Sequence, residues 1–206
     1  MDNHLIRPVA NNSDKAYTYG KMKGRYKKAM AEHFYFEAVM IDYAVLEDRL
    51  RSFLYHIGAL TNRTSQKLDQ KNTKQFLLGL YNEQYHKNKK GLSISGISTK
   101  YDLIRAVLEW VNTAEGVEDK YARTLKHACE SLDLDDVFHC LDEIEAWCKY
   151  RNELIHGLMN KDLMSLYAEI GDKAKEGMEL AVRVDAYVDT VSKRNTIRKS
   201  IKLKTN

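Results

Sequence analysis

Three side chains that could act together on a phosphate, Arg151, Asn152 and His156, stand within one six-residue stretch of the chain. Histidine titrates near neutral pH, so it can accept the proton of a ribose 2′-hydroxyl or donate one to a leaving 5′-oxygen. Arginine offers a planar set of donors to a phosphate whose negative charge grows in the transition state. These residue types are the minimum that RNA cleavage without a metal requires.

The spacing of apolar residues places this stretch on a long helix. Apolar side chains recur at helical intervals along one stripe, and Arg151 occupies the one position of the stripe that is not apolar. A buried charge without a partner is strongly unfavourable, so Arg151 must pair or face a cleft. Asn152 and His156 are four residues apart and share a neighbouring face, and Gly157 can loosen or end the helix. The stripe consists of Val137, Leu141, Ile144, Cys148, Ile155 and Leu158.

An earlier helix supplies the predicted partner of Arg151. Glu47 is the polar residue on an otherwise apolar stripe, so we expect a salt bridge between Glu47 and Arg151 that holds the guanidinium in place. Such pairing could be the whole role of Arg151, and His156 could instead interact with the last carbonyls of its helix. These structural roles and a catalytic role stay open. The stripe around Glu47 consists of Phe36, Met40, Tyr43, Leu50, Leu54 and Ile57.

The stretch from Arg151 to His156 resembles the signature of the HEPN superfamily, in which an Arg is followed four to six residues later by a His, often with Asn directly after the Arg. The resemblance implies a small helical bundle, usually dimeric, and a metal-independent endoribonuclease of the kind found in toxin–antitoxin, abortive-infection and CRISPR systems. It implies that Arg151 and His156 are the catalytic pair, supported by Asn152. Members paired with a nucleotidyltransferase antitoxin commonly carry Tyr two places after the His, where this chain has Leu158, so the subfamily stays open.

The leading hypothesis is therefore a homodimeric endoribonuclease in which two copies of residues 151–156 meet across a two-fold axis. The expected products are a 2′,3′-cyclic phosphate and a 5′-hydroxyl, and the resemblance implies a toxin or antiviral role with an antitoxin or defence-system protein as a possible partner. The second hypothesis is a non-catalytic helical module that binds RNA or a protein. A third is a helical subunit that regulates a larger nucleotide-binding enzyme.

We expect no metal and no cofactor. The spacings of the histidines and cysteines match no zinc pattern, and the chain has no glycine-rich phosphate loop. Three cysteines do not suggest a disulfide framework, so we expect them to be reduced and mostly buried. The two tryptophans, Trp110 and Trp147, are interpreted as core residues. The candidate metal ligands are His127, Cys129, His139, Cys140 and Cys148.

Composition predicts an all-α protein. A chain of 206 residues with one Pro and ten Gly favours a single domain built from long helices. We expect a HEPN-like bundle of about five to six helices over residues 27–192, with flexible basic ends at residues 1–26 and 193–206. No run of 18 apolar residues occurs and the first twenty residues are polar, so we expect a cytoplasmic protein.

Charge is concentrated at the two ends of the chain. Residues 1–30 hold seven Lys and Arg against two Asp and Glu, and residues 193–206 hold six against none. Basic ends on an acidic body could steer the protein toward a nucleic-acid backbone, or they could be solvated tails. Lys149, Lys193 and Arg194 are the predicted RNA contacts.

Hydrophobic periodicity predicts where the helices lie. Ser131 or Asp133 is expected to cap the helix that carries Arg151. The final helix is expected to be interrupted near Gly171 or Gly177. The segment between residues 87 and 98 is interpreted as a mobile loop that could face substrate. Helices are expected over residues 27–60, 74–85, 100–113, 117–131 and 162–191.

Overall fold

The computed structural model describes residues 12–60, 68, 71–157 and 162–193, and these residues form seven α-helices and no strands. The prediction of an all-α fold is confirmed, although seven helices exceed the five to six expected. The helices are α1 Asn12–Ala31, α2 Tyr35–His56, α3 Lys71–Gln84, α4 Ile97–Thr113, α5 Lys120–Cys129, α6 Leu134–Gly157 and α7 Leu163–Lys193.

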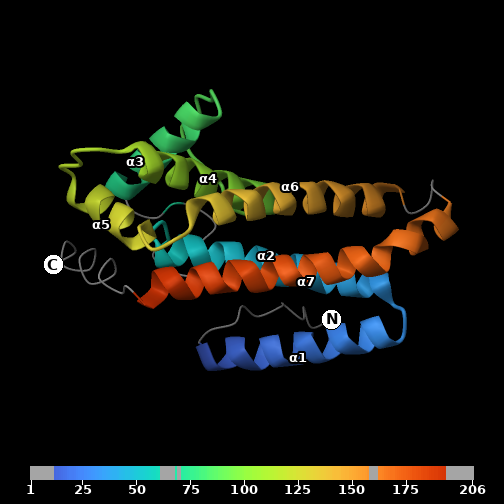
Figure 1. Ribbon diagram of the computed structural model, residues 1–206. Helices are drawn as coiled ribbons and strands as arrows, with labels where there is room; N and C mark the ends of the chain where they lie inside the picture. The colour runs from blue at the N-terminus through green and yellow to red at the C-terminus, as the bar shows by residue number, and fades with distance from the viewer. Residues whose placement is uncertain (1–11, 61–67, 69–70, 158–161, 194–206) are drawn as a thin grey trace, which may run out of the picture.

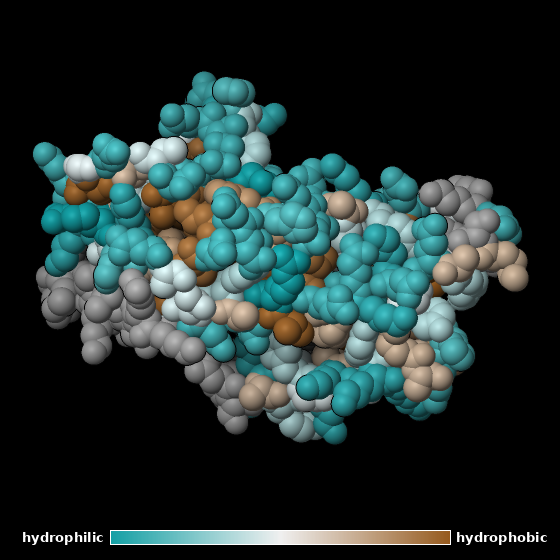
Figure 2. Space-filling model, in the orientation of Figure 1, coloured by the Kyte–Doolittle hydropathy of each residue, from teal (hydrophilic) through white to brown (hydrophobic). Residues whose placement is uncertain are grey.

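The three longest helices, α2, α6 and α7, run side by side and form the body of the molecule (Figure 1). Helix α1 packs on the outer side of α2, while α4 contacts both α2 and α6. Helices α3 and α5 pack against α4 at one end of the body. The face drawn in Figure 2 is mostly hydrophilic, with small hydrophobic areas between polar side chains. Fully buried side chains from these helices include Leu46, Leu50, Phe53, Leu103, Leu108, Ile144 and Trp147.

The long helix expected to start near Lys27 is in fact two helices. The chain turns at residues 32–34, where His33 adopts a positive φ of 62°, and α2 then runs back along α1. The prediction of a flexible segment is wrong for residues 12–26, because these residues form most of α1 and pack on the body. Residues 1–11 lie outside the described residues.

Polar contacts hold α1 in place. The Lys15 ammonium lies 2.7 Å from Asp48, and the Tyr19 hydroxyl hydrogen-bonds the same carboxylate. The Tyr26 hydroxyl donates to the carbonyl of Ala174, at 3.2 Å. Because this helix is fixed by hydroxyl groups and charges as much as by an apolar face, hydrophobic periodicity does not reveal it.

The final helix is continuous, so the predicted interruption near Gly171 or Gly177 is wrong. The two glycines allow close helix packing instead. A Cβ atom on Gly177 would lie 2.5 Å from Cζ2 of Trp147, and one on Gly171 would lie 3.2 Å from Cζ of Tyr35. Both positions therefore favour a residue without a side chain although glycine weakens the helix locally.

Other sequence predictions are confirmed. Asp133 caps α6, since its side chain accepts the backbone N–H of Asp136 at 3.2 Å and its carbonyl accepts that of Val137 at 3.0 Å. All three cysteines are free and buried. Trp147 is fully buried, and Trp110 packs edge-on against a phenylalanine of α3. No helix within the described ranges combines the length and apolar character needed to cross a bilayer.

Candidate functional site on helix α6

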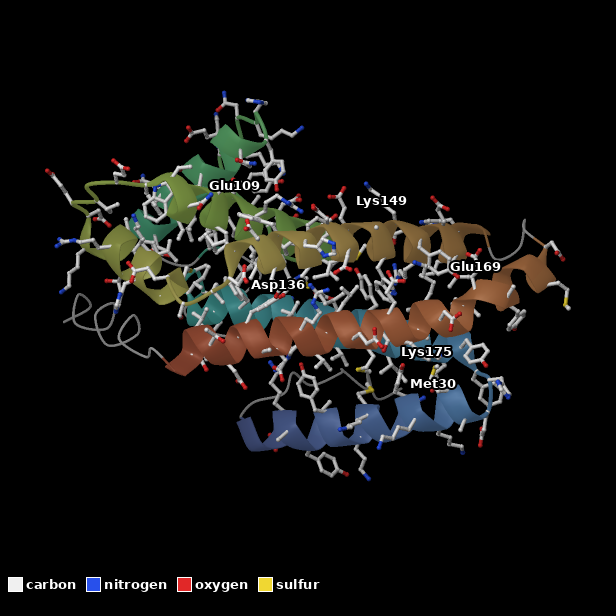
Figure 3. All side chains as sticks on the ribbon, in the orientation of Figure 1. Met30, Glu109, Asp136, Lys149, Glu169 and Lys175 are labelled. Atoms are coloured by element: carbon white, nitrogen blue, oxygen red, sulfur yellow. The ribbon has the colours of Figure 1, made fainter. Side chains whose placement is uncertain are left out.

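The last two turns of α6 carry the predicted site residues on two adjoining faces. Lys149, Asn152 and His156 are spaced three and four residues apart, so they follow one ridge of the helix, and all three are exposed. Figure 3 shows Lys149 on the side of α6 that faces away from α7. Arg151 is half-buried, and its side chain reaches α2. The helix end thus presents a polar ridge beside a partly sheltered cation.

The guanidinium of Arg151 is fixed by an aromatic ring and an amide. Its Cζ lies 3.9 Å from the ring centroid of Tyr43, a cation–π arrangement. Its Nη1 donates to Oδ1 of Asn152 at 3.0 Å, and Nη2 lies 3.9 Å from Sδ of Met40. Burial raises the pKa of the Tyr43 hydroxyl, and the neighbouring Arg151 opposes that rise. Asn152 therefore draws the guanidinium toward the exposed ridge that also carries His156.

No carboxylate among the described residues pairs with Arg151. In addition, its Nε is buried without a hydrogen-bond partner. A half-buried cation that is balanced by a ring face and an amide dipole keeps most of its positive potential. The arrangement is suited to receiving an anion.

The predicted salt bridge between Glu47 and Arg151 is wrong within this chain. Oε1 of Glu47 accepts from the Lys100 ammonium at 2.8 Å and lies 3.3 Å from Nη2 of Arg51. Lys100 is fully buried and also donates to two backbone carbonyls, those of residues 95 and 96. Burial lowers the pKa of Lys100, and Glu47 opposes this effect. Because a fully buried ammonium needs a carboxylate more than a half-buried guanidinium does, Glu47 bonds to Lys100.

His156 lies on the last turn of α6, where its side chain is exposed. It makes no hydrogen bond to any described residue, so the alternative role of binding the last helical carbonyls has no support there. Five residues separate it from Arg151, which is a rotation of about 140° around the helix axis. The two side chains therefore leave the helix in different directions. The Arg151–Asn152 hydrogen bond brings the guanidinium partly back toward the ridge that carries His156.

The remaining predicted site residues are placed as follows. Lys149 forms an ion pair with Glu145, one turn earlier on α6, at 2.7 Å. Lys193 is the last residue of α7, and Arg194 lies outside the described residues. The two histidines considered as metal ligands, His127 and His139, each pair with a nearby glutamate.

The three cysteines are buried, and burial determines the protonation of their thiols when no metal is bound. Burial raises the pKa of Cys129 to about 12, that of Cys140 to about 11 and that of Cys148 to about 12, so the thiols stay protonated. Metal ligation requires the thiolate. Within the described ranges no group of three His, Cys, Asp or Glu residues is arranged to hold a metal ion.

Sequence reasoning missed the residues that hold Arg151. Their spacing predicts that Tyr43 and Met40 are apolar members of a core stripe, which is the usual role of such residues at helical spacing. The available signal was their position, since both lie on the same face of α2 as Glu47 and within two turns of it. A tyrosine beside a predicted buried arginine is a candidate for stacking.

In chemical terms, the end of α6 offers a cation able to receive a phosphate, an amide that orients it, and an exposed imidazole on the adjoining ridge. Comparison of the chain with protein-family models, with curated proteins and with solved structures found no match.

Proposed function

We propose that this protein is a metal-independent endoribonuclease of HEPN type. The observation that carries the proposal is the state of Arg151, which is held by Tyr43 and Asn152, lacks a carboxylate partner among the described residues, and lies five residues before the exposed His156. Such a guanidinium can bind the scissile phosphate and stabilise the charge that grows on it. The resemblance of residues 151–156 to the HEPN signature supports the same assignment.

In the proposed reaction the ribose 2′-oxygen attacks the adjacent phosphorus. The bond from phosphorus to the 2′-oxygen forms and the bond to the 5′-oxygen breaks, which leaves a 2′,3′-cyclic phosphate and a 5′-hydroxyl. One imidazole accepts the 2′-hydroxyl proton and another donates a proton to the leaving oxygen. His156 from each of two chains would fill these two roles, and Arg151 would hold the phosphate between them.

A homodimer is part of this proposal. Within one chain the side chains of Arg151 and His156 leave the α6 backbone about 140° apart, and the reaction needs two imidazoles. A second copy of the chain is the simplest source of the second imidazole. Large apolar side chains are exposed at the starts of α2 and α7, where Phe34 is 58 % exposed, Met164 79 % and Tyr167 55 %. The start of α7 follows the end of α6 in the chain, so this apolar surface adjoins the site and suits a two-fold contact.

The test is cleavage of labelled single-stranded RNA in EDTA. We expect the wild-type protein to produce fragments with cyclic phosphate ends, and His156→Ala to lose activity by about 100-fold or more. His139→Ala is the matched control, because His139 is also exposed on α6 and lies more than four turns away. Equal cleavage by wild type and His156→Ala would place any nuclease site elsewhere. Folding of each variant is checked by circular dichroism.

A toxin or antiviral role in the cytoplasm, with an antitoxin or a defence-system protein as partner, is proposed from the resemblance alone. Growth arrest on induced expression, relieved by His156→Ala, would support it. Normal growth during expression of an active nuclease would argue against a toxin.

The second candidate is a non-catalytic helical module that binds RNA or a protein. The observation in its favour is the packing of Arg151 on Tyr43 and Met40, which gives the arginine a structural role. This candidate predicts that Arg151→Ala lowers the melting temperature while wild-type protein leaves RNA intact. The endoribonuclease proposal instead predicts loss of cleavage in a folded protein.

A further inference from the structure

A projecting arm of the molecule carries a cluster of lysines far along the chain from α6. The arm comprises residues 82–91, which are the last turn of α3 and the loop that follows it. Figure 1 shows this part standing out beyond the body, and Figure 2 shows its surface as almost wholly hydrophilic. Three lysines and one glutamate give the arm a net positive charge.

Hydrogen bonds hold the arm in shape. The side chain of Asn82 donates to the carbonyl of Lys89 at 3.0 Å and accepts the backbone N–H of the same residue at 3.1 Å. The Tyr85 hydroxyl donates to the carbonyl of Asp102 at 3.1 Å, which ties the arm to α4. Beyond the loop, Ile94 is fully buried. These contacts indicate a held loop in place of the mobile loop predicted from composition.

The lysines of the arm are not used for ion pairs. Lys87, Lys89 and Lys90 are exposed, and none of them pairs with a described carboxylate. Elsewhere on the surface the pattern varies: Lys149 and Lys173 each bond to a glutamate three or four residues away. Lys21, Lys23 and Lys27 on α1 are, like the arm lysines, exposed and not paired with a described carboxylate. An ordered loop that presents three unneutralised cations is a good match for an evenly charged backbone of phosphates.

The chemistry of the arm favours backbone binding over base reading. Lys89 lies 5.0 Å from the ring centroid of Tyr81, but that ring is 5 % exposed and therefore cannot stack on a base. Lysine is a point charge without the planar fork that reads base edges in pairs. Contacts of this kind hold nucleic acid without regard to its base sequence.

Electrostatics connect the arm with the ridge on α6. Burial raises the pKa of Asp102 on α4, the nearby carboxylate of Glu145 on α6 adds to the rise, and Lys89 of the arm opposes it. Asp102 therefore lies close enough to both the arm and α6 for their charges to change its pKa. Glu145 in turn pairs with Lys149, which starts the ridge that ends at His156.

We propose that residues 82–91 form a second RNA-binding site. This site binds the phosphate backbone of a single strand, and the same strand is cleaved at the end of α6. This inference rests on the proposed endoribonuclease function for the identity of its ligand. It assigns the arm a role in affinity and none in the chemical step.

The experiment measures binding of fluorescein-labelled 2′-O-methyl RNA by fluorescence anisotropy in EDTA over a range of salt concentrations. This RNA lacks the attacking hydroxyl, so binding is observed whether or not the protein is a nuclease. The arm variant combines Lys87→Gln, Lys89→Gln and Lys90→Gln. The control variant combines Lys21→Gln, Lys23→Gln and Lys27→Gln on the exposed face of α1, which removes the same charge from the opposite edge of the molecule in Figure 1.

We expect the arm variant to lower affinity by about 100-fold at 0.1 M salt and to reduce the slope of log K against log salt by about 2, the values for three lost phosphate contacts on a single strand. The control should stay within about threefold of wild type. Unchanged binding by the arm variant, or an equal loss in the control, would overturn the proposal. The proposal would also be overturned if the arm variant lost binding to phosphatidylserine vesicles and kept its affinity for RNA, because the arm would then bind a membrane. A parallel incubation uses unmodified RNA of the same sequence. If this RNA stays intact with a wild-type protein that binds through the arm, the nuclease proposal alone is refuted.

Discussion

A buried carboxyl group, Asp42 on α2, should make the stability of this protein fall as pH rises. Asp42 is 0 % exposed, and both of its carboxyl oxygens are buried without a hydrogen-bond partner. Its surroundings are Trp147 of α6, Gly177 of α7 and, more distantly, the Tyr26 hydroxyl of α1. Burial raises the pKa of Asp42 from 3.8 to about 8. The native state therefore favours the protonated acid at neutral pH.

Because the pKa of Asp42 is raised on folding, the stability of the protein falls as pH rises. A group whose pKa is higher in the folded than in the unfolded state contributes fully to stability below its unfolded pKa, and the contribution is lost as pH rises through the folded pKa. The loss for Asp42 thus extends from about pH 4 to about pH 8, at about 1.4 kcal/mol per pH unit. At pH 7 it amounts to about 4 kcal/mol, a large part of the stability of a domain.

The variant Asp42→Asn keeps the size of the side chain and removes its titration. We expect Asp42→Asn and wild type to have similar free energies of unfolding near pH 4, and the variant to be more stable by about 4 kcal/mol at pH 7. Urea denaturation followed by circular dichroism at several pH values measures both curves. Asp172→Asn, at an exposed position on α7, is the control for loss of one negative charge and should show no such gain. Parallel curves for wild type and Asp42→Asn would refute the reasoning.

Three further substitutions or measurements test the structure. Gly177→Ala should lower the free energy of unfolding by about 1 to 3 kcal/mol in the same denaturation assay, because the new methyl group would collide with Trp147. Gly79→Ala in α3 should raise it by about 0.5 to 1 kcal/mol, because a methyl group there meets nothing within 4 Å. Glu47→Gln should destabilise by about 2 to 4 kcal/mol through the buried Lys100, and the added change Lys100→Met should restore most of that loss; a double variant as unstable as the single one would contradict this account. Light scattering should give twice the chain mass of 23.9 kDa, and a monomer at micromolar concentration would remove the dimer from the proposed function.

Helical periodicity was enough to predict the fold class and most helices, because each of these helices buries an apolar face. The stripe around Arg151 and the cap at Asp133 follow from local rules of this kind. What could not be predicted depends on contacts between segments distant in the chain. Gly177 weakens a helix by any local rule. Glycine is nevertheless favoured there because Trp147 packs directly against this position.

The wrong partner for Arg151 has a similar cause. The sequence predicts a pair between Glu47 and Arg151 because each is a charge on an otherwise apolar stripe. Lys100 is a third such charge, since it lies in line with Ile97 and Ile104 on α4. The helix predicted over residues 100–113 begins at Lys100, and charges are common at helix ends, so the sequence does not mark this lysine as buried. Burial decides between the two cations, and burial is a property of the assembled bundle.

This exchange of partners bears directly on the proposed chemistry. Two unit charges 4 Å apart attract one another by about 4 kcal/mol at an effective dielectric constant of 20, so an Arg151 paired with Glu47 would have to give up an attraction of that order to meet a phosphate. A cation held over an aromatic ring gives up about 0.5 to 2 kcal/mol, and Tyr43 can remain in contact while the open edge of the guanidinium binds. By drawing Glu47 away, Lys100 leaves Arg151 fixed in position and electrostatically unsatisfied. That combination is what a preorganised phosphate-binding group requires.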